Sequence, residues 1–131
     1  MFSKLTPNLK VPDVKKAVEF YESLGFTTVA TVPEEGIASF AILVDGPVEL
    51  MLQSGESLVE DIPAAGEREI GSSIVLYLDV DDIQALHDRV AGKAEVVVPM
   101  RDTFYGMREF YITDPHGYLI GFAQKVEGEN S

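Results

Sequence analysis

The sequence predicts an α+β fold made of two similar halves, and three observations support this. The order of one strand, one helix and three further strands is read over residues 4–53, and it returns over residues 72–125. An acidic segment with weak periodicity, residues 54–71, separates the halves. The length of 131 residues, with 46% hydrophobic residues, suits one ordinary domain with ample material for a core.

The first half begins with a strand over residues 5–11, where apolar and polar residues alternate. Asp13 is typical of a helix N-cap, and the apolar residues after it recur at helical spacing until Gly25 ends the helix. Three short strands follow, separated by the turn-forming sequences PEEG and DGP. They are predicted over residues 26–32, 37–44 and 48–53.

The segment 54–71 is rich in acidic residues and contains Gly and Pro. Loops of this length are usually either functional or flexible. We therefore expect a connector or a mobile flap here.

The second half repeats the pattern with a strand over residues 72–80 and a helix within 81–92, whose apolar residues fall on one face. A strand over 94–99 and a hairpin over 104–122 complete it. Each half then has one helix for one face of a four-stranded sheet. The other face is left to be covered by the other half, a partner chain or a ligand, which implies a groove.

The composition of the chain limits its possible partners, metal sites and location. The formal charge of −12 disfavours nucleic acid and anionic membranes as partners and favours cationic ligands. Cysteine is absent and there are two histidines, so metal ligands are few. The sequence has no apolar run long enough to span a bilayer, and its start turns polar too soon for a signal peptide, so a cytoplasmic protein is expected.

Three stretches carry a resemblance to a known family: TPNLKVPDVKKAVEFYESLGF, LYLDVDDIQALHDRV and YGMREFYITDPHGYLIGF. With them the chain resembles the vicinal oxygen chelate superfamily of glyoxalases, extradiol dioxygenases, and bleomycin and fosfomycin resistance proteins, and most of all its bleomycin-resistance-like branch. The resemblance implies one domain over 1–131, two βαβββ modules in a cupped mixed sheet, and a homodimer with sites in the cups. It does not fix an activity, because this scaffold serves lyases, dioxygenases, transferases and binding proteins.

The resemblance also implies where metal ligands would lie, on the first and last strand of each module. The corresponding positions here are Thr6, Glu49, Val75 and Gly121. Only Glu49 could bind a metal, whereas a catalytic metal ordinarily needs about three protein ligands. A register error of two would substitute Asn8, Met51, Tyr77 or Leu119, which assembles no site either. We therefore expect no metal and no cofactor.

The two histidines do not change this expectation. His116 lies in DPHG, a sequence typical of a type I turn, and is expected at an exposed tip. His87 is spaced with Ile83 and Val90 and is expected at the helix edge, packed against the sheet.

Alternation along the strands selects the residues of the expected cup. In residues 48–53 the apolar side packs on the helix, which leaves Glu49 and its alternate neighbours facing inward. In the hairpin, Tyr105-Gly106 stands where the bleomycin-resistance branch often has Trp-Gly. A ring there could stack on a planar or cationic ligand, or serve only sheet and dimer packing; Arg108 could anchor a carboxylate or pair with a neighbouring acid. The predicted ligand-binding residues are Asn8, Glu49, Met51, Gln53, Tyr77, Phe104, Tyr105 and Arg108.

Three functional hypotheses follow. The first is a metal-independent protein that binds a small, cationic or aromatic molecule in a dimer cleft. The second is a lyase or dioxygenase with a degenerate metal site that uses Glu49. The third is metal-free acid/base catalysis by Glu49, whose pKa would be raised by burial among Met51, Val75 and Tyr77; the alternative is a solvated or ion-paired glutamate.

Overall fold

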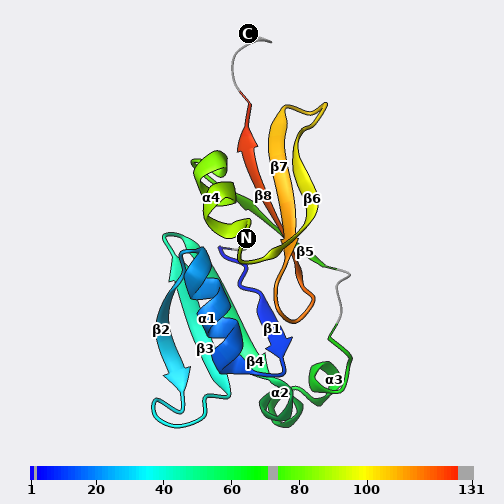
Figure 1. Cartoon of the computed structure of the whole chain (residues 1–131). Helices are drawn as coiled ribbons and strands as arrows, with labels where there is room; N and C mark the ends of the chain where they lie inside the picture. The colour runs from blue at the N-terminus through cyan, green and yellow to red at the C-terminus, as the bar shows by residue number, and fades with distance from the viewer. Residues whose placement is uncertain (2, 71–73, 127–131) are drawn as a thin grey trace. The chain divides into compact units, whose positions relative to one another are not determined.

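The computed structural model describes residue 1, residues 3–70 and residues 74–126, which belong to two compact units, Met1–Ile70 and Gly71–Ser131. Each unit has a four-stranded mixed sheet with a helix packed against it, so the predicted α+β fold of two βαβββ modules is confirmed (Figure 1). That the chain acts as a single domain with a cup stays a prediction.

The first module has the predicted order of elements. Its sheet runs β1-β4-β3-β2, with β1 and β4 parallel and the other neighbours antiparallel. The elements are β1 (Asn8–Val11), α1 (Val14–Leu24), β2 (Thr27–Val32), β3 (Phe40–Asp45) and β4 (Val48–Ser54).

Helix α1 forms for the reasons that the sequence suggests. The Asp13 carboxylate accepts a hydrogen bond from the Lys16 amide at 3.1 Å and so caps the first turn. Gly25, with a φ of 123°, ends the helix in a conformation that other residues rarely adopt. The buried side of the helix consists of Val14, Ala17, Tyr21 and Leu24.

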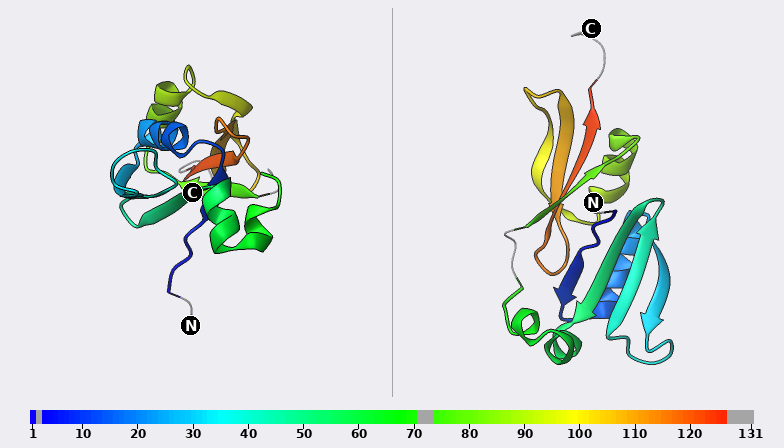
Figure 2. Two further views of the ribbon diagram at one scale, coloured as in Figure 1. Left: turned by 90° about the horizontal axis from the view of Figure 1, so that it is seen from below. Right: turned by 180° about the vertical axis from the view of Figure 1, so that it is seen from behind.

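Strand alternation divides the first sheet into two faces. Leu9, Leu50 and Leu52 are buried on the face that packs on α1. Asn8 and Met51, which are partners in the ladder, therefore lie on the opposite face. Figure 2 (right) shows this side of the sheet with α1 behind the strands. We call the face opposite each module's strand-packing helix its open face.

The first strand is shorter than predicted. The ladder begins at Asn8, and Leu5, expected on the apolar side, is 90% exposed. Pro7 has no N–H to donate to a ladder, although its carbonyl accepts a bond from the Met51 amide at 2.9 Å. The alternation of residues 5–7 thus has no structural counterpart.

The segment predicted as a connector or flap contains two short helices that the sequence analysis did not predict, α2 (Gly55–Asp61) and α3 (Pro63–Gly66). Ser54 caps α2 by accepting a bond from the Ser57 amide at 3.2 Å. The Lys10 ammonium group of β1 donates to the carbonyls of Gly66 and Arg68, at 2.6 and 2.5 Å. Whether the segment moves stays a prediction.

The second module repeats the topology of the first, with strand order β5-β8-β7-β6 and β5 parallel to β8. Phe110, Ile112, Ile120 and Phe122 form the buried face against the helix. Residues 72 and 73 of the predicted strand lie outside the described residues. The elements are β5 (Val75–Asp79), α4 (Ile83–Val90), β6 (Glu95–Asp102), β7 (Met107–Thr113) and β8 (Leu119–Lys125).

Both histidine residues make contacts within the protein. His87 packs its ring edge-on against Phe110 of β7, with 4.8 Å between ring centroids, as predicted. At the predicted turn, the Asp114 carbonyl accepts a bond from the Gly117 amide at 3.2 Å, and its carboxylate accepts one from the His116 amide at 2.8 Å. His116 is half-buried with its ring Nε2 covered, so the expectation of an exposed tip is wrong for this side chain. In the described part of the chain, no helix has the length and apolar character needed to span a bilayer.

Candidate functional site

Glu49 lies on the open face of the first sheet and is ion-paired. Its carboxylate accepts hydrogen bonds from the Lys4 ammonium group and the Thr6 hydroxyl, each at 2.8 Å. These bonds, with Lys4 first, lower the pKa of Glu49, and burial opposes them without reversing the effect. The raised pKa that acid/base catalysis by Glu49 would need is therefore not found, and the ion-paired alternative describes this residue.

A second polar network crosses the same face. The Asn8 side-chain amide donates to the Gln53 carbonyl oxygen at 2.9 Å, and the Gln53 amide donates to the Ser57 hydroxyl at 2.9 Å. Gln53 is buried. The network joins β1, β4 and α2 and fixes the amide of Gln53, since a buried polar group that lost its partners would cost free energy.

An open hollow of about 440 Å³ lies beside this network. Its size falls within the range of small-molecule sites. It combines one aromatic ring with two carboxylates and two hydroxyls. The lining residues are Val32, Ser39, Phe40, Gln53, Ser57, Glu60 and Asp61.

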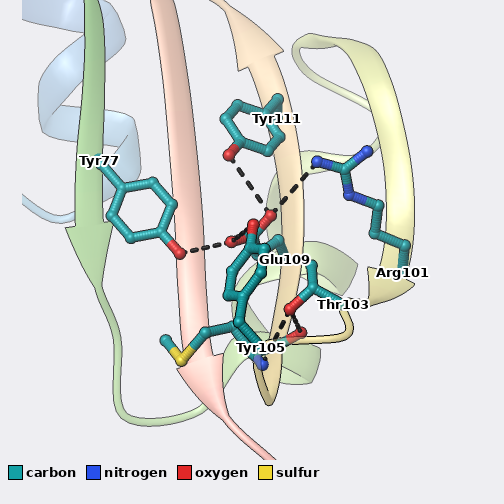
Figure 3. A network of polar contacts seen from close by, with 7 residues as sticks. Tyr77, Arg101, Thr103, Tyr105, Glu109 and Tyr111 are labelled. Carbon is teal, nitrogen blue, oxygen red and sulfur yellow. Dashed lines mark hydrogen bonds and ion pairs between the residues drawn. The ribbon is translucent and has the colours of Figure 1, made fainter.

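The open face of the second sheet carries a buried carboxylate, Glu109 of β7, whose side chain has no solvent-exposed surface. The hydroxyls of Tyr77 and Tyr105 donate to its Oε2, the latter at 2.8 Å. The Tyr111 hydroxyl and the Arg101 guanidinium group approach Oε1 at 3.4 Å each. These five residues, drawn in Figure 3, are called the Glu109 cluster.

The charge of Glu109 is stabilised by its donors. Burial is the largest single effect and raises the pKa of this carboxyl group. Hydrogen bonds from Tyr77, Tyr105 and Arg101 together outweigh burial and hold the pKa below its usual value. Glu109 is therefore ionised at neutral pH.

The three phenols of the Glu109 cluster stay protonated at neutral pH. Hydrogen bonding to Glu109 raises the pKa of the Tyr77 and Tyr105 hydroxyls, with burial and the negative charge acting in the same direction. For Tyr111, burial comes first and the charge of Glu109 second, and its pKa is also raised. Each phenol thus has its proton to donate.

Aromatic surface extends from this cluster. Tyr105 is 53% exposed and Phe104 is 99% exposed, and their rings meet edge-on with centroids 5.1 Å apart. A hollow of about 280 Å³ is lined by these two residues with Arg101 and Thr103. Two of the predicted ligand-binding aromatics therefore lie at one hollow.

Arg108 is not part of this cluster. Its guanidinium group pairs with the carboxylate of Asp102 at 2.7 and 3.1 Å, in a bidentate arrangement between register partners of β6 and β7. As the neighbour of Glu109 in β7, it points to the other face of the sheet. Of the two roles predicted for Arg108, pairing with a neighbouring acid is present, and ligand anchoring stays a prediction.

The positions implied for metal ligands do not fit a metal. Thr6 donates to Glu49, Glu49 is held by Lys4, and Val75 has an apolar side chain. At Gly121 a Cβ atom would lie 2.5 Å from Cε2 of Tyr111, so the ring occupies the space of any ligand side chain. Within residues 1, 3–70 and 74–126, no three His, Asp or Glu side chains come together in a way that could hold a metal ion.

The sequence profile of the Glyoxalase/Bleomycin resistance protein/Dioxygenase superfamily matches residues 6–122. The chain belongs to this superfamily. A bleomycin resistance protein of Geobacillus stearothermophilus is 29% identical to it over 131 residues, which is 92% of this chain and 96% of that protein. A protein of the same name from Staphylococcus aureus gives the same values.

Solved structures agree with this membership. TioX from Micromonospora sp. ML1 superposes with a TM-score of 0.75 at 22% identity, covering 95% of this chain and all of that one. A glyoxalase/bleomycin resistance protein/dioxygenase from Nocardioides has a TM-score of 0.77 at 23% identity, covering 98% of this chain and 87% of that one. At these identities the likeness shows the fold alone.

In this superfamily member, sequence reasoning placed Asn8, Glu49 and Gln53 correctly on one open face but missed Glu109 and its partner Arg101. The signal was present. Residues 110 and 112 are apolar and 109 and 111 polar or amphipathic, so the alternation applied to the first module's last strand would have placed Glu109 and Tyr111 on the open face.

Proposed function

We propose that this protein binds and sequesters a small cationic or aromatic molecule without a metal ion. The curated relatives at 29% identity are named bleomycin resistance proteins, and the proposal gives this chain a task of the same kind. The binding would take place in a cleft of a cytoplasmic homodimer. The family alone does not decide this, since it also contains enzymes.

The observation that carries the proposal is the state of Glu49. It is the only residue at the four family metal positions with a ligand side chain, and that side chain already bonds to Lys4 and Thr6 at 2.8 Å. A metal ion would have to displace an ammonium group and would gain only one ligand. Binding without a metal is therefore favoured over metal-dependent catalysis.

Charge and surface chemistry support the choice of ligand. The chain has a formal charge of −12, which attracts cations over a range set by ionic strength. The hollow in the first module adds Glu60 and Asp61 beside the ring of Phe40. An aromatic face with nearby carboxylates suits a planar cation.

The homodimer is proposed because members of the superfamily to which this chain belongs are usually dimeric. Light scattering at several protein concentrations is expected to give twice the mass of the 14.3 kDa chain. The mass of a single chain at every concentration would contradict the dimer.

Two enzyme alternatives remain. A lyase or dioxygenase with a degenerate metal site would require stoichiometric metal that Glu49 helps to hold. Metal-free catalysis by Glu49 is disfavoured, because a carboxylate with a lowered pKa is a weaker base. Once a substrate is known, an unchanged rate in Glu49→Gln would exclude the second alternative.

Isothermal titration with bleomycin, a cationic glycopeptide, tests the proposal on chelator-treated protein. Saturable binding is expected, and Phe40→Ala should weaken it by about tenfold if the ring stacks on the ligand. Ile37→Ala is the matched control, since it also removes apolar surface but is 93% exposed and does not line the hollow. No binding of bleomycin or of any other aromatic cation in a panel would overturn the proposal.

A further inference from the structure

The hydrogen atoms of the Glu109 cluster can be assigned from the hydrogen-bond geometry if Glu109 is ionised. An ionised carboxylate only accepts hydrogen bonds, whereas a phenol has one proton to donate. Tyr77 and Tyr105 both bond to Oε2 of Glu109, so each must spend its proton on that oxygen. Tyr111, at 3.4 Å from Oε1, has the same orientation available.

Each of these phenol oxygens is consequently left with lone pairs only. At Tyr105 and Tyr111 these lone pairs also face donors of the protein, the Thr103 hydroxyl and the Arg101 guanidinium group. Toward any molecule that reaches it, a phenol that donates to Glu109 acts as an acceptor. A hydrogen bond to a charged acceptor also polarises the donor, which makes its oxygen a stronger acceptor in turn. Tyr77 and Tyr105 are 46% and 53% exposed, so a ligand can contact these two residues while Glu109 stays covered.

We propose that the Glu109 cluster is a subsite for a hydrogen-bond donor group of a planar ligand, such as an amidinium, guanidinium or ammonium group, and that it discriminates against carboxylates. The ligand's ring would lie in the hollow that Phe104 and Tyr105 line together with Arg101 and Thr103, and its donor group would meet the phenol oxygen of Tyr105. The inference rests on the proposed function and deepens it, because it states what the second module recognises.

The positive charge of Arg101 would favour the opposite selectivity, a preference for carboxylates. Its guanidinium group is half exposed, lies 3.4 Å from Glu109 and stands 5.7 Å from the ring centroid of Tyr111. It compensates the charge of Glu109 from one side, while the shortest contacts of the carboxylate are those to Tyr77 and Tyr105. If the phenols set the selectivity, Arg101→Met should strengthen binding of a cation by removing a like charge.

Three probes that share one ring system test the proposal: 2-naphthamidine, 2-naphthamide and 2-naphthoate. They stack equally well but present a charged donor, a neutral amide and a charged acceptor. Titrations followed by NMR on the full chain are expected to rank the affinities in that order, with naphthamidine about tenfold or more tighter than naphthoate.

Variants assign the preference to the cluster. Glu109→Gln replaces a carboxylate that only accepts hydrogen bonds by an amide that also donates them. At least one phenol then accepts a hydrogen bond from residue 109 instead of donating one to it. We expect it to weaken naphthamidine by about tenfold and to leave naphthoate unchanged or tighter. Glu95→Gln removes the same charge from an exposed position of β6 and should change neither affinity by more than about twofold.

The double variant Tyr77→Phe with Tyr105→Phe keeps the rings and removes the acceptor oxygens. It therefore tests the proposal even if Glu109→Gln does not fold, and we expect it to lose the preference for naphthamidine. Equal affinities of the three probes for the native protein, or a preference for naphthoate that Arg101→Met abolishes, would overturn the inference and leave the proposed function standing. Failure of bleomycin and all three probes to bind would overturn both, and binding of bleomycin alone would overturn only the subsite.

Discussion

Replacing Tyr77 by phenylalanine removes one hydroxyl group from the open face of the second sheet and keeps the ring. The lost hydrogen bond runs to the fully buried, ionised carboxylate of Glu109. Hydrogen bonds to charged groups contribute about 1.5–3 kcal/mol. Because Tyr77 is 46% exposed and water can replace part of the bond, we expect Tyr77→Phe to lower the free energy of unfolding by about 1–2 kcal/mol.

Denaturant unfolding followed by circular dichroism measures this loss, and a double-mutant cycle with Glu109→Gln isolates the bond itself. The coupling between the two positions is expected to be about 1 kcal/mol. A Tyr77→Phe variant as stable as the native protein, together with no coupling in the cycle, would refute the claim that this bond holds Glu109 in its charged form.

Two further predictions concern the Glu109 cluster, and a third concerns the contact between α2 and α3. The pKa of Glu109 is held below its unfolded value of 4.5, so its stabilising effect is complete above that pH and is lost as the pH falls through the folded pKa. On acidification, the Glu109→Gln variant should therefore lose less stability than the native protein. A parallel loss in the two proteins would contradict this prediction. The same variant should shift tyrosine ionisation to lower pH in ultraviolet titration, because Tyr105 loses its charged acceptor, and an unchanged titration would argue against the cluster. Gly66→Ala should destabilise the protein by about 1–3 kcal/mol in thermal unfolding, because its Cβ atom would lie 2.3 Å from the Val59 amide nitrogen. Gly92→Ala, which has open space around it, should be neutral or stabilising. Equal effects of the two substitutions would show that the contact at Gly66 relaxes freely.

The fold could be predicted from the sequence because its signals are local. Asp13 and Gly25 mark both ends of α1, and the repeat of element order gives the two modules. The helices of residues 55–66 were missed because they are short and acidic, with too few apolar positions to show a period. Ser54 as a cap and Pro63 at a helix start were signals that could have indicated them.

For the candidate site, only those features could be predicted that depend solely on the face of the sheet to which a side chain points. Alternation placed Asn8, Glu49 and Gln53 together, but it could not show that Lys4 reaches Glu49, because residue 4 precedes the strand. A pKa depends on such partners and not on the face of a strand, so alternation alone could not decide between a Glu49 with a raised pKa and the ion-paired Glu49 that the structure has.

Ligand binding without a metal ion is tested by two measurements on tag-free protein before and after chelation: metal content per subunit by elemental mass spectrometry, and bleomycin binding. We expect substoichiometric metal and equal, saturable binding in the two samples. About one transition metal per subunit, with binding that chelation abolishes and added metal restores, would contradict it and direct attention to lyase and dioxygenase chemistry.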